Sequence, residues 1–303
     1  MAITAKDVQN LREMTGVGMM DCKKALTEAE GNVDKAIEIL REKGLAASAK
    51  KAGRIAAEGM AYAAVVDGMG VVVEVNAETD FVAKNEKFVD FVKGVAATVA
   101  ANKPADLDAL MACKYAGTDK TVTEQQQEMV LVIGENIKVR RFFFFAENIS
   151  VPYIHAGGKI GVLVNLKVEG GIDATEIGKD VAMQIAALNP RFWDKSQVTQ
   201  DVLDEEKKIM LAQMDNDPKM ASKPEQVKVK IVEGKLNKFY AENCLLQQDF
   251  VKDGEFTVEK YIASAAKALG GTVTFVSAVR FEKGEGIEKR VDDFAAEVAS
   301  MIK

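Results

Sequence analysis

His155 is the single histidine among the 303 residues, so it is the sole candidate for histidine-based acid–base chemistry. It ends an apolar segment beside Gly157-Gly158. A catalytic triad would pair it with an activated serine, but the sequence has no G-x-S-x-G element, no H-E-x-x-H and no G-x-x-x-x-G-K-[ST] phosphate loop. These residues favour a binding protein over an enzyme, with His155 either structural or in contact with a partner.

The three cysteines, Cys22, Cys113 and Cys244, are far apart and form no C-x-x-C pair. This spacing indicates buried, reduced thiols in a cytoplasmic protein rather than disulfide bonds or a metal site. A His-rich metal site is excluded because one histidine cannot supply its ligands. We therefore expect neither a metal ion nor a cofactor.

Two segments place large apolar side chains within polar, turn-rich sequence, which is typical of partner-binding surfaces. In the first, Met19 and Met20 follow a glycine turn, and they either complete a small core or contact a partner. The second segment, between a predicted strand and a predicted helix, consists of Thr79, Asp80, Phe81 and Val82. Phe81 is either a core anchor or a wedge that inserts into a partner, and the residues alone favour the anchor.

The elements that position the first segment are predicted as three short amphipathic helices over residues 4–44. Thr4 with Asp7 forms a capping box at the first helix start. Gly31 is expected to end the second helix and Gly44 the third. The three helices should form a small bundle with a thin core.

Beyond residue 60, one order of elements recurs: a hairpin, a helix, an insertion, a helix and a strand. The hairpins are Met60–Val66 with Val71–Asn76 and Val151–Ala156 with Lys159–Val168, and the closing strands are 138–146 and 272–281. Thr123 with Gln126, and Asp173 with Glu176, are expected to cap helices. The repetition predicts an α+β protein with two similar subdomains.

Residues 200–214 and 225–240 are highly charged and carry narrow apolar stripes. The stripes are Leu203, Met210 and Met214 in the first and Val227, Ile231 and Phe239 in the second. Such stripes predict an antiparallel helical hairpin that projects into solvent, and whether it contacts a partner stays open. A last stripe, between Ile287 and Ile302, predicts a C-terminal helix.

The chain has 40 Lys and Arg against 46 Asp and Glu, a net charge of −6, so no overall field attracts nucleic acid. Lys50, Lys51 and Arg54 make an RNA-associated protein the alternative hypothesis, although such a run among alanines is typical of a solvated linker helix. No apolar stretch has the length of a membrane helix. Charged residues near the start predict no secretory or mitochondrial leader.

Five segments resemble those of the translation elongation factor Ts family. Residues 15–44, TGVGMMDCKKALTEAEGNVDKAIEILREKG, resemble its amino-terminal module, and residues 74–88, EVNAETDFVAKNEKF, resemble its second signature. The others are IGENIKVRR at 133–141, HAGGKIGVLV at 155–164 and RFEKGEGIEK at 280–289. The resemblance spans essentially the whole chain, and it departs from the family at Phe142–Phe145, where smaller residues are usual.

The resemblance implies an α+β fold with an N-terminal three-helix, ubiquitin-associated-like (UBA-like) module. Two duplicated α/β subdomains with antiparallel sheets, an inserted coiled-coil hairpin and a C-terminal helix would follow. The implied boundaries are 1–53 for the module, 54–150 and 151–282 for the subdomains, about 199–240 for the hairpin, and 283–303 for the C-terminal helical module.

The resemblance also implies a cytoplasmic guanine nucleotide exchange factor for elongation factor Tu, the GTPase that carries aminoacyl-tRNA, without chemical turnover of its own. Residues 79–82 would displace the magnesium ion of the GTPase, with Phe81 as the wedge. Met19 and Met20 would contact a GTPase helix, and His155 would press near its phosphate loop. No cofactor, membrane or direct nucleic-acid contact is implied, and a homo-oligomer stays open.

Overall fold

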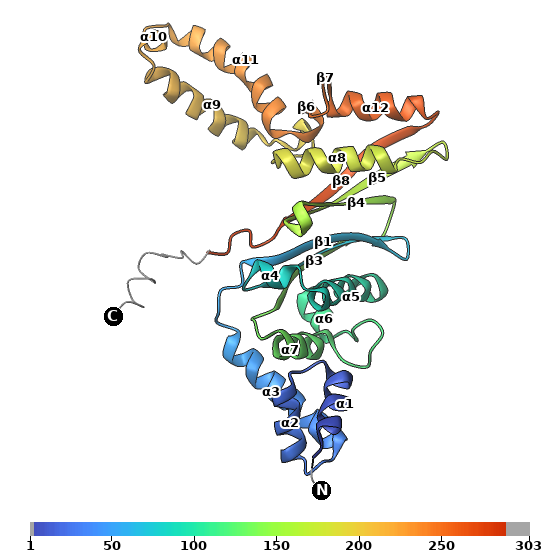
Figure 1. Ribbon diagram of the computed structural model, residues 1–303. Helices are drawn as coiled ribbons and strands as arrows, with labels where there is room; N and C mark the ends of the chain where they lie inside the picture. The colour runs from blue at the N-terminus through green and yellow to red at the C-terminus, as the bar shows by residue number, and fades with distance from the viewer. Residues whose placement is uncertain (1–2, 289–303) are drawn as a thin grey trace. The chain divides into compact units, whose positions relative to one another are not determined.

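A computed structural model describes residues 3–288 of the chain (Figure 1). These residues form two compact units, each of which is described by itself. The first unit comprises residues 3–144, 154–161 and 281–288, and the second comprises residues 145–153 and 162–280. The C-terminal helix predicted within 283–303 falls mainly outside the described residues.

The first unit begins with the predicted three helices, α1 (Ala5–Thr15), α2 (Met19–Glu28) and α3 (Val33–Lys51). The capping box of Thr4 and Asp7 is confirmed. Buried apolar side chains from all three helices and the turns between them form a core: Val8, Leu11, Val17, Cys22, Ala25, Leu26, Ala29, Ala36 and Leu40. The N-terminal bundle is therefore present as predicted.

The prediction that Gly44 ends the third helix is wrong, because α3 continues to Lys51. The residues after Gly44 are mostly alanine and lysine, which favour a helix strongly enough to carry it past one glycine. Gly44 instead faces α7 (Val122–Ile133), where an added Cβ would lie 3.5 Å from the carbonyl oxygen of Gln127. The glycine thus lies where two helices pack closely.

A three-stranded sheet follows, with strands β1 (Glu58–Val66), β2 (Met69–Ala77) and β3 (Lys138–Phe145) in the order β1-β2-β3. The hairpin turn is shorter than predicted: Asp67 and Gly68 alone connect the strands, with φ of 49° and 79°. Both values lie in the left-handed region that a two-residue hairpin turn requires. β2 is buried along its whole length, and α5 (Glu86–Asn102) packs against β1 and β2.

The phenylalanine run at the end of β3 follows the period of a strand. Phe142 and Phe144 are partly buried against the core of this unit, whereas Phe143 is exposed. Alternate residues of a strand point to opposite faces, so the bulky run is accommodated by one face packing inward.

Three helices connect β2 to β3 besides α5: α4 (Asp80–Ala83), α6 (Leu107–Ala112) and α7. The predicted cap of α7 is wrong, since Thr121 and Glu124 form the capping box. The hydroxyl of Thr123 donates to the carbonyl oxygen of Met111, and the side chain of Gln126 accepts from the amide of Val139 in β3. Both side chains of the predicted cap therefore bond to residues outside α7 and do not cap the helix.

The second sheet repeats the topology of the first, with β4 (Ile149–His155), β5 (Ile160–Glu169) and β8 (Thr272–Glu282) in the order β4-β5-β8. A short 3₁₀ turn, η1 (Ala156–Gly158), joins β4 to β5. The helices between β5 and β8 include α8 (Thr175–Leu188) and α12 (Val258–Ala268), which pack on each other. The predicted order of elements is confirmed in both halves.

The predicted capping box of α8 is wrong. Asp173 accepts a hydrogen bond from the amide of Thr175 at 2.9 Å, but Glu176 pairs with Lys179 on the helix surface instead of reaching back. Ala174 occupies the N-cap position, and its side chain makes no hydrogen bond that caps the helix. The aspartate thus turns the chain into the helix without forming the reciprocal bond.

The insertion of the second unit is a helical hairpin formed by α9 (Gln200–Asp215), α10 (Pro218–Ala221) and α11 (Glu225–Asn243). Within this unit, α9 and α11 pack together and extend away from the sheet (Figure 1). The stripe on α11 is offset from the prediction, because Lys228, Val232 and Phe239 are buried while Val227 is exposed.

Smaller elements flank the insertion. They are the 3₁₀ turns η2 (Lys195–Gln197) and η3 (Leu245–Gln247) and the short paired strands β6 (Asp249–Phe250) and β7 (Asp253–Thr257). The sequence patterns did not predict the β6–β7 pair, because β6 has only two residues and β7, DGEFT, does not alternate between apolar and polar residues.

Candidate functional site

The segment Thr79–Val82 forms the start of α4 shortly after β2 ends, and it presents an exposed aromatic side chain. Thr79 is the N-cap of α4, and Val82 and Ala83 are buried. Phe81 is 80% exposed. Because successive residues of a helical turn point in different directions, burying Val82 leaves Phe81 in solvent. The expectation that Phe81 anchors the core is therefore wrong, and Val82 is the anchor.

The chain just before Phe81 is held by Glu135, which follows the C-cap residue of α7. One oxygen of the Glu135 carboxylate accepts hydrogen bonds from the amides of Glu78 and Thr79 at 3.1 and 3.0 Å. Its other oxygen accepts the hydroxyl of Thr79 at 2.7 Å. Bonds to an ionised acceptor are stronger than neutral ones, so this loop has a defined shape in the free protein.

Asp80 carries a negative charge beside Phe81. Its carboxylate pairs with Lys84 at 3.0 Å, one turn along the chain. The hydrogen bond and the charge of Lys84, with a smaller contribution from Lys283, lower the pKa of Asp80 below its usual value. The exposed phenylalanine therefore lies next to an ionised carboxylate at neutral pH.

Met19 and Met20 open α2, and both side chains are exposed, at 41% and 64%. The interpretation that they complete the core of the bundle is therefore wrong. The turn before them, Gly16–Gly18, lines a groove of about 400 Å³ that Phe81 also lines. Lys87 lines the same groove, and its ammonium donates to the carbonyl oxygen of Gly16 at 3.4 Å. The groove therefore adjoins the start of α2 and the turn that carries Phe81, but Met19 and Met20 are not among the residues that line it.

His155 is exposed at the end of β4, and the groove lining does not include it. The turn η1 after it packs on β1, as does α4. Gly158 in this turn has a φ of +97°, and an added Cβ would lie 2.6 Å from Cγ of Met60. The loop of His155 and the helix of Phe81 are therefore both supported by the same strand.

The basic residues of the RNA hypothesis make contacts within the protein. The Lys51 ammonium donates to the carbonyl oxygen of Gly134 at 2.6 Å, at the C-terminal end of α7. The Arg54 guanidinium pairs with Glu78 at 3.4 Å. Cations commonly satisfy the carbonyl groups at helix ends, so the first contact gives Lys51 a structural role, and the ion pair engages Arg54 within the protein.

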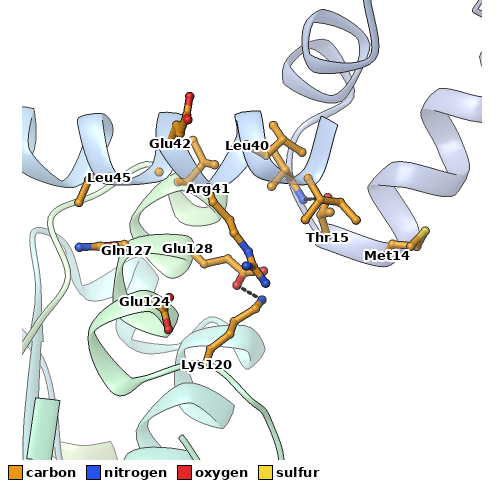
Figure 2. Close-up of a pocket in the computed structure, with 14 residues that line it drawn as sticks. Met14, Thr15, Leu40, Arg41, Glu42, Leu45, Lys120, Glu124, Gln127 and Glu128 are labelled. Carbon is orange, nitrogen blue, oxygen red and sulfur yellow. Dashed lines mark hydrogen bonds and ion pairs between the residues drawn. The ribbon is translucent and has the colours of Figure 1, made fainter. Parts of the chain in front are cut away.

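A cavity of about 450 Å³ lies elsewhere in the first unit, between α1, α3 and α7 (Figure 2). Its wall combines apolar side chains such as Met14 and Leu40 with the ion pair of Lys120 and Glu128 (Figure 2). The residues that line it include none of those predicted to contact a partner. The cavity therefore belongs to the packing of the three-helix bundle on α7.

A sequence profile of the family described as "Elongation factor TS" matches residues 78–285. Proteins named elongation factor Ts match along their whole length: that of Syntrophotalea carbinolica is 50% identical, with 100% of both chains covered. That of Clostridium perfringens (strain SM101) is 49% identical, with 99% of each chain covered. The chain belongs to the elongation factor Ts family.

The match to the elongation factor Ts profile begins at Glu78 and ends at Glu285, so it includes Phe81 and His155. The full-length relatives extend the similarity to the segment of Met19 and Met20; the protein of Trichlorobacter lovleyi, at 48% identity, covers 99% of this chain and 98% of its own. Among residues 3–288, no helix has both the length and the apolar character needed to cross a membrane.

Sequence reasoning did not single out Glu135 as a residue of the site. The one available signal was its place in IGENIKVRR, directly after the glycine that ends α7. Its partner Thr79 is 56 residues away in sequence, so only the fold shows that the two meet.

Proposed function

We propose that this protein is a guanine nucleotide exchange factor for elongation factor Tu, and that residues 79–82 carry the exchange activity. The observation that supports this most directly is the 80% exposure of Phe81 on a turn that is fixed by its neighbours. An exposed, held aromatic side chain is suited to inserting into a partner. Membership of the elongation factor Ts family supports the choice of partner.

The insertion acts on the magnesium site of the partner. A GTPase holds GDP through backbone amides and a magnesium ion on the phosphates, and magnesium requires near-ideal octahedral geometry. A wedge that displaces the elements around the ion therefore loosens GDP. The exchange factor needs no chemical turnover of its own, since it only changes how tightly the partner binds the nucleotide.

The magnitude of this effect is consistent with one side chain. A buried phenylalanine removes about 150–250 Å² from water, worth about 4–6 kcal/mol before ordering and desolvation costs. If the coupling free energy between the binding of the factor and the binding of GDP is about 2.7 kcal/mol, the affinity of the GTPase for the nucleotide falls about a hundredfold. Linkage is reciprocal, so GDP and then GTP weaken the binding of the factor by the same ratio.

Other elements take supporting roles in this proposal. Met19 and Met20, on a UBA-like three-helix module, contact a helix of the GTPase, where flexible methionines adapt to the partner surface. His155 presses near the phosphate loop. The hairpin of α9 and α11, as a coiled coil, adds further contact.

The test is the rate at which elongation factor Tu releases a fluorescent GDP in stopped-flow mixing. Phe81→Ala should slow the stimulated release about 5- to 150-fold without lowering the melting temperature, because the side chain is exposed. Phe256→Ala, at a partly exposed phenylalanine of β7, is the matched control. A wild-type rate for Phe81→Ala would show that the wedge assignment is wrong. If the binding affinity of the protein instead fell steeply as the salt concentration rose, RNA binding would be favoured.

A further inference from the structure

We propose that Glu135 is a positioning residue for exchange, which holds the loop of Phe81 in the conformation that enters the partner. The proposal rests on the function proposed above. Glu135 does not belong to the segment that inserts, and its own side chain is half-buried. Its role follows from the hydrogen bonds that it accepts and from what those donors hold in turn.

The first step is that one hydroxyl group, that of Thr79, links Glu135 to the turn that carries Phe81. Thr79 Oγ1 donates to Glu135 at 2.7 Å and accepts from the amide of Val82 at 3.5 Å. The amide of Val82 belongs to the single turn of α4 that carries Phe81. The carboxylate of Glu135 therefore orients the hydroxyl that caps this turn.

The second step is a reciprocal set of bonds between the two loops. While Glu135 accepts from the amides of Glu78 and Thr79, the carboxylate of Glu78 accepts from the amide of Asn136 at 2.6 Å. The side-chain amide of Asn136 donates to the carbonyl oxygen of Arg54 at 2.8 Å. Each loop thus satisfies backbone donors of the other, so neither can move alone without leaving a donor unpaired.

The third step is that the turn has little else to fix it. A helix of four residues is far too short to be stable by its own hydrogen bonds. Phe81 contributes little to holding it, because its side chain is 80% exposed. The burial of Val82 and Ala83 places the turn on the protein, and the cap at Thr79 decides its conformation.

Holding the loop in order before binding should raise the affinity of the factor for its partner more than it changes the rate of GDP release from the bound complex. A loop that is already ordered binds without the cost of ordering it, whereas a loosened loop can still insert Phe81 once it is captured. Loss of Glu135 should therefore raise the concentration of the factor at which GDP release is half-maximal, and leave the maximal release rate near that of the wild type.

The experiment compares Glu135→Ala and the gentler Glu135→Gln with Glu128→Ala, which removes another half-buried glutamate of the α7 region, one that pairs with Lys120. Hydrogen exchange of the Glu78 and Thr79 amides, measured without any partner, should accelerate about tenfold or more in the Glu135 variants. The half-saturating concentration for GDP release should rise by a similar factor. Glu128→Ala should change neither quantity.

The outcomes separate this proposal from the function on which it rests. Unchanged amide exchange in both Glu135 variants would overturn the positioning role, as would accelerated exchange with an unchanged half-saturating concentration. A reduced maximal rate with unchanged half-saturation would also overturn it. If Phe81→Ala, assayed in parallel, leaves GDP release unaltered, the proposed function fails, while the amide exchange still reports whether Glu135 holds the loop.

Discussion

The Glu74 carboxylate lies 2.5 Å from Nε of Arg141 although the Glu74 side chain has no exposed surface. Its other oxygen accepts from Arg140 at 2.9 Å, from the side-chain amide of Asn76 at 3.1 Å and from the backbone amide of Gly284 at 2.8 Å. A buried charge is tolerated only when it is paired and fully hydrogen-bonded. The cluster meets this condition, and it joins three segments that are far apart in the sequence.

Removing the central carboxylate should therefore destabilise the first unit. We expect Glu74→Ala to lower the free energy of unfolding by about 3 kcal/mol or more, because two guanidinium groups and two amide donors lose their acceptor. Urea unfolding followed by circular dichroism measures this. Glu169→Ala is the control, since Glu169 also pairs from a strand but is 61% exposed, and its midpoint should stay near that of the wild type. Equal midpoints for the two variants would contradict the prediction.

Two helical glycines should respond to alanine with opposite signs. In Gly44→Ala the new Cβ would lie 3.5 Å from its nearest neighbour, an ordinary contact, so the gain in helix propensity should raise stability by about 0.5–1 kcal/mol. In Gly94→Ala the Cβ would lie 1.9 Å from the hydroxyl of Tyr115, so α5 or the ring must move and stability should fall by about 1–3 kcal/mol. Thermal melting of both variants decides this, and a shift in the same direction would count against the packing described here.

Thiol chemistry should distinguish the three cysteines. Cys22 and Cys244 have no exposed surface, whereas Cys113 is half-buried. Burial raises the pKa of Cys22 above its usual value and raises the pKa of Cys244 to about 11. Since the thiolate is the reactive form, Ellman's reagent at pH 8 should label Cys113 first in the folded protein, and Cys113→Ser should remove that fast phase.

The raised pKa of Cys244 predicts how the free energy of unfolding depends on pH. The thiol of Cys244 ionises near pH 9.0 in an ordinary environment and near pH 11 in the folded protein. Below pH 9 it stays protonated in both states and does not change stability, and above pH 9 ionisation of the unfolded chain draws the protein toward unfolding. Urea midpoints should fall between pH 9 and 11, with a shallower slope in Cys244→Ala. Identical slopes would mean that this thiol is not the titrating group.

Features that depend on a few neighbouring residues could be predicted from the sequence. The capping box of Thr4 and Asp7 needs only residues three positions apart, and the first hairpin needs an Asp-Gly turn with alternating flanks. The same applies to the repeated order of elements, because periodicity identifies each strand and helix within its own segment.

Features decided by distant partners could not be predicted in this way. Gly44 looks like a helix end until α7 is seen to pack against it, and Thr123 looks like a cap until its hydroxyl is seen to donate to Met111. The sequence predicted residues 79–82 as a site, but it could not show which of Phe81 and Val82 faces the core. That choice depends on how the turn sits on β1 and β2.

The hydrogen bonds that Glu74 accepts from Arg140, Arg141, Asn76 and Gly284 cannot all form at the same stage of translation. All three strands of the first sheet exist once Phe145 has been made, so that sheet can close early. The Gly284 amide is added 210 residues after Glu74. Until then the nascent first unit holds a carboxylate short of one donor, and the last stretch of translation supplies the group that completes its interior.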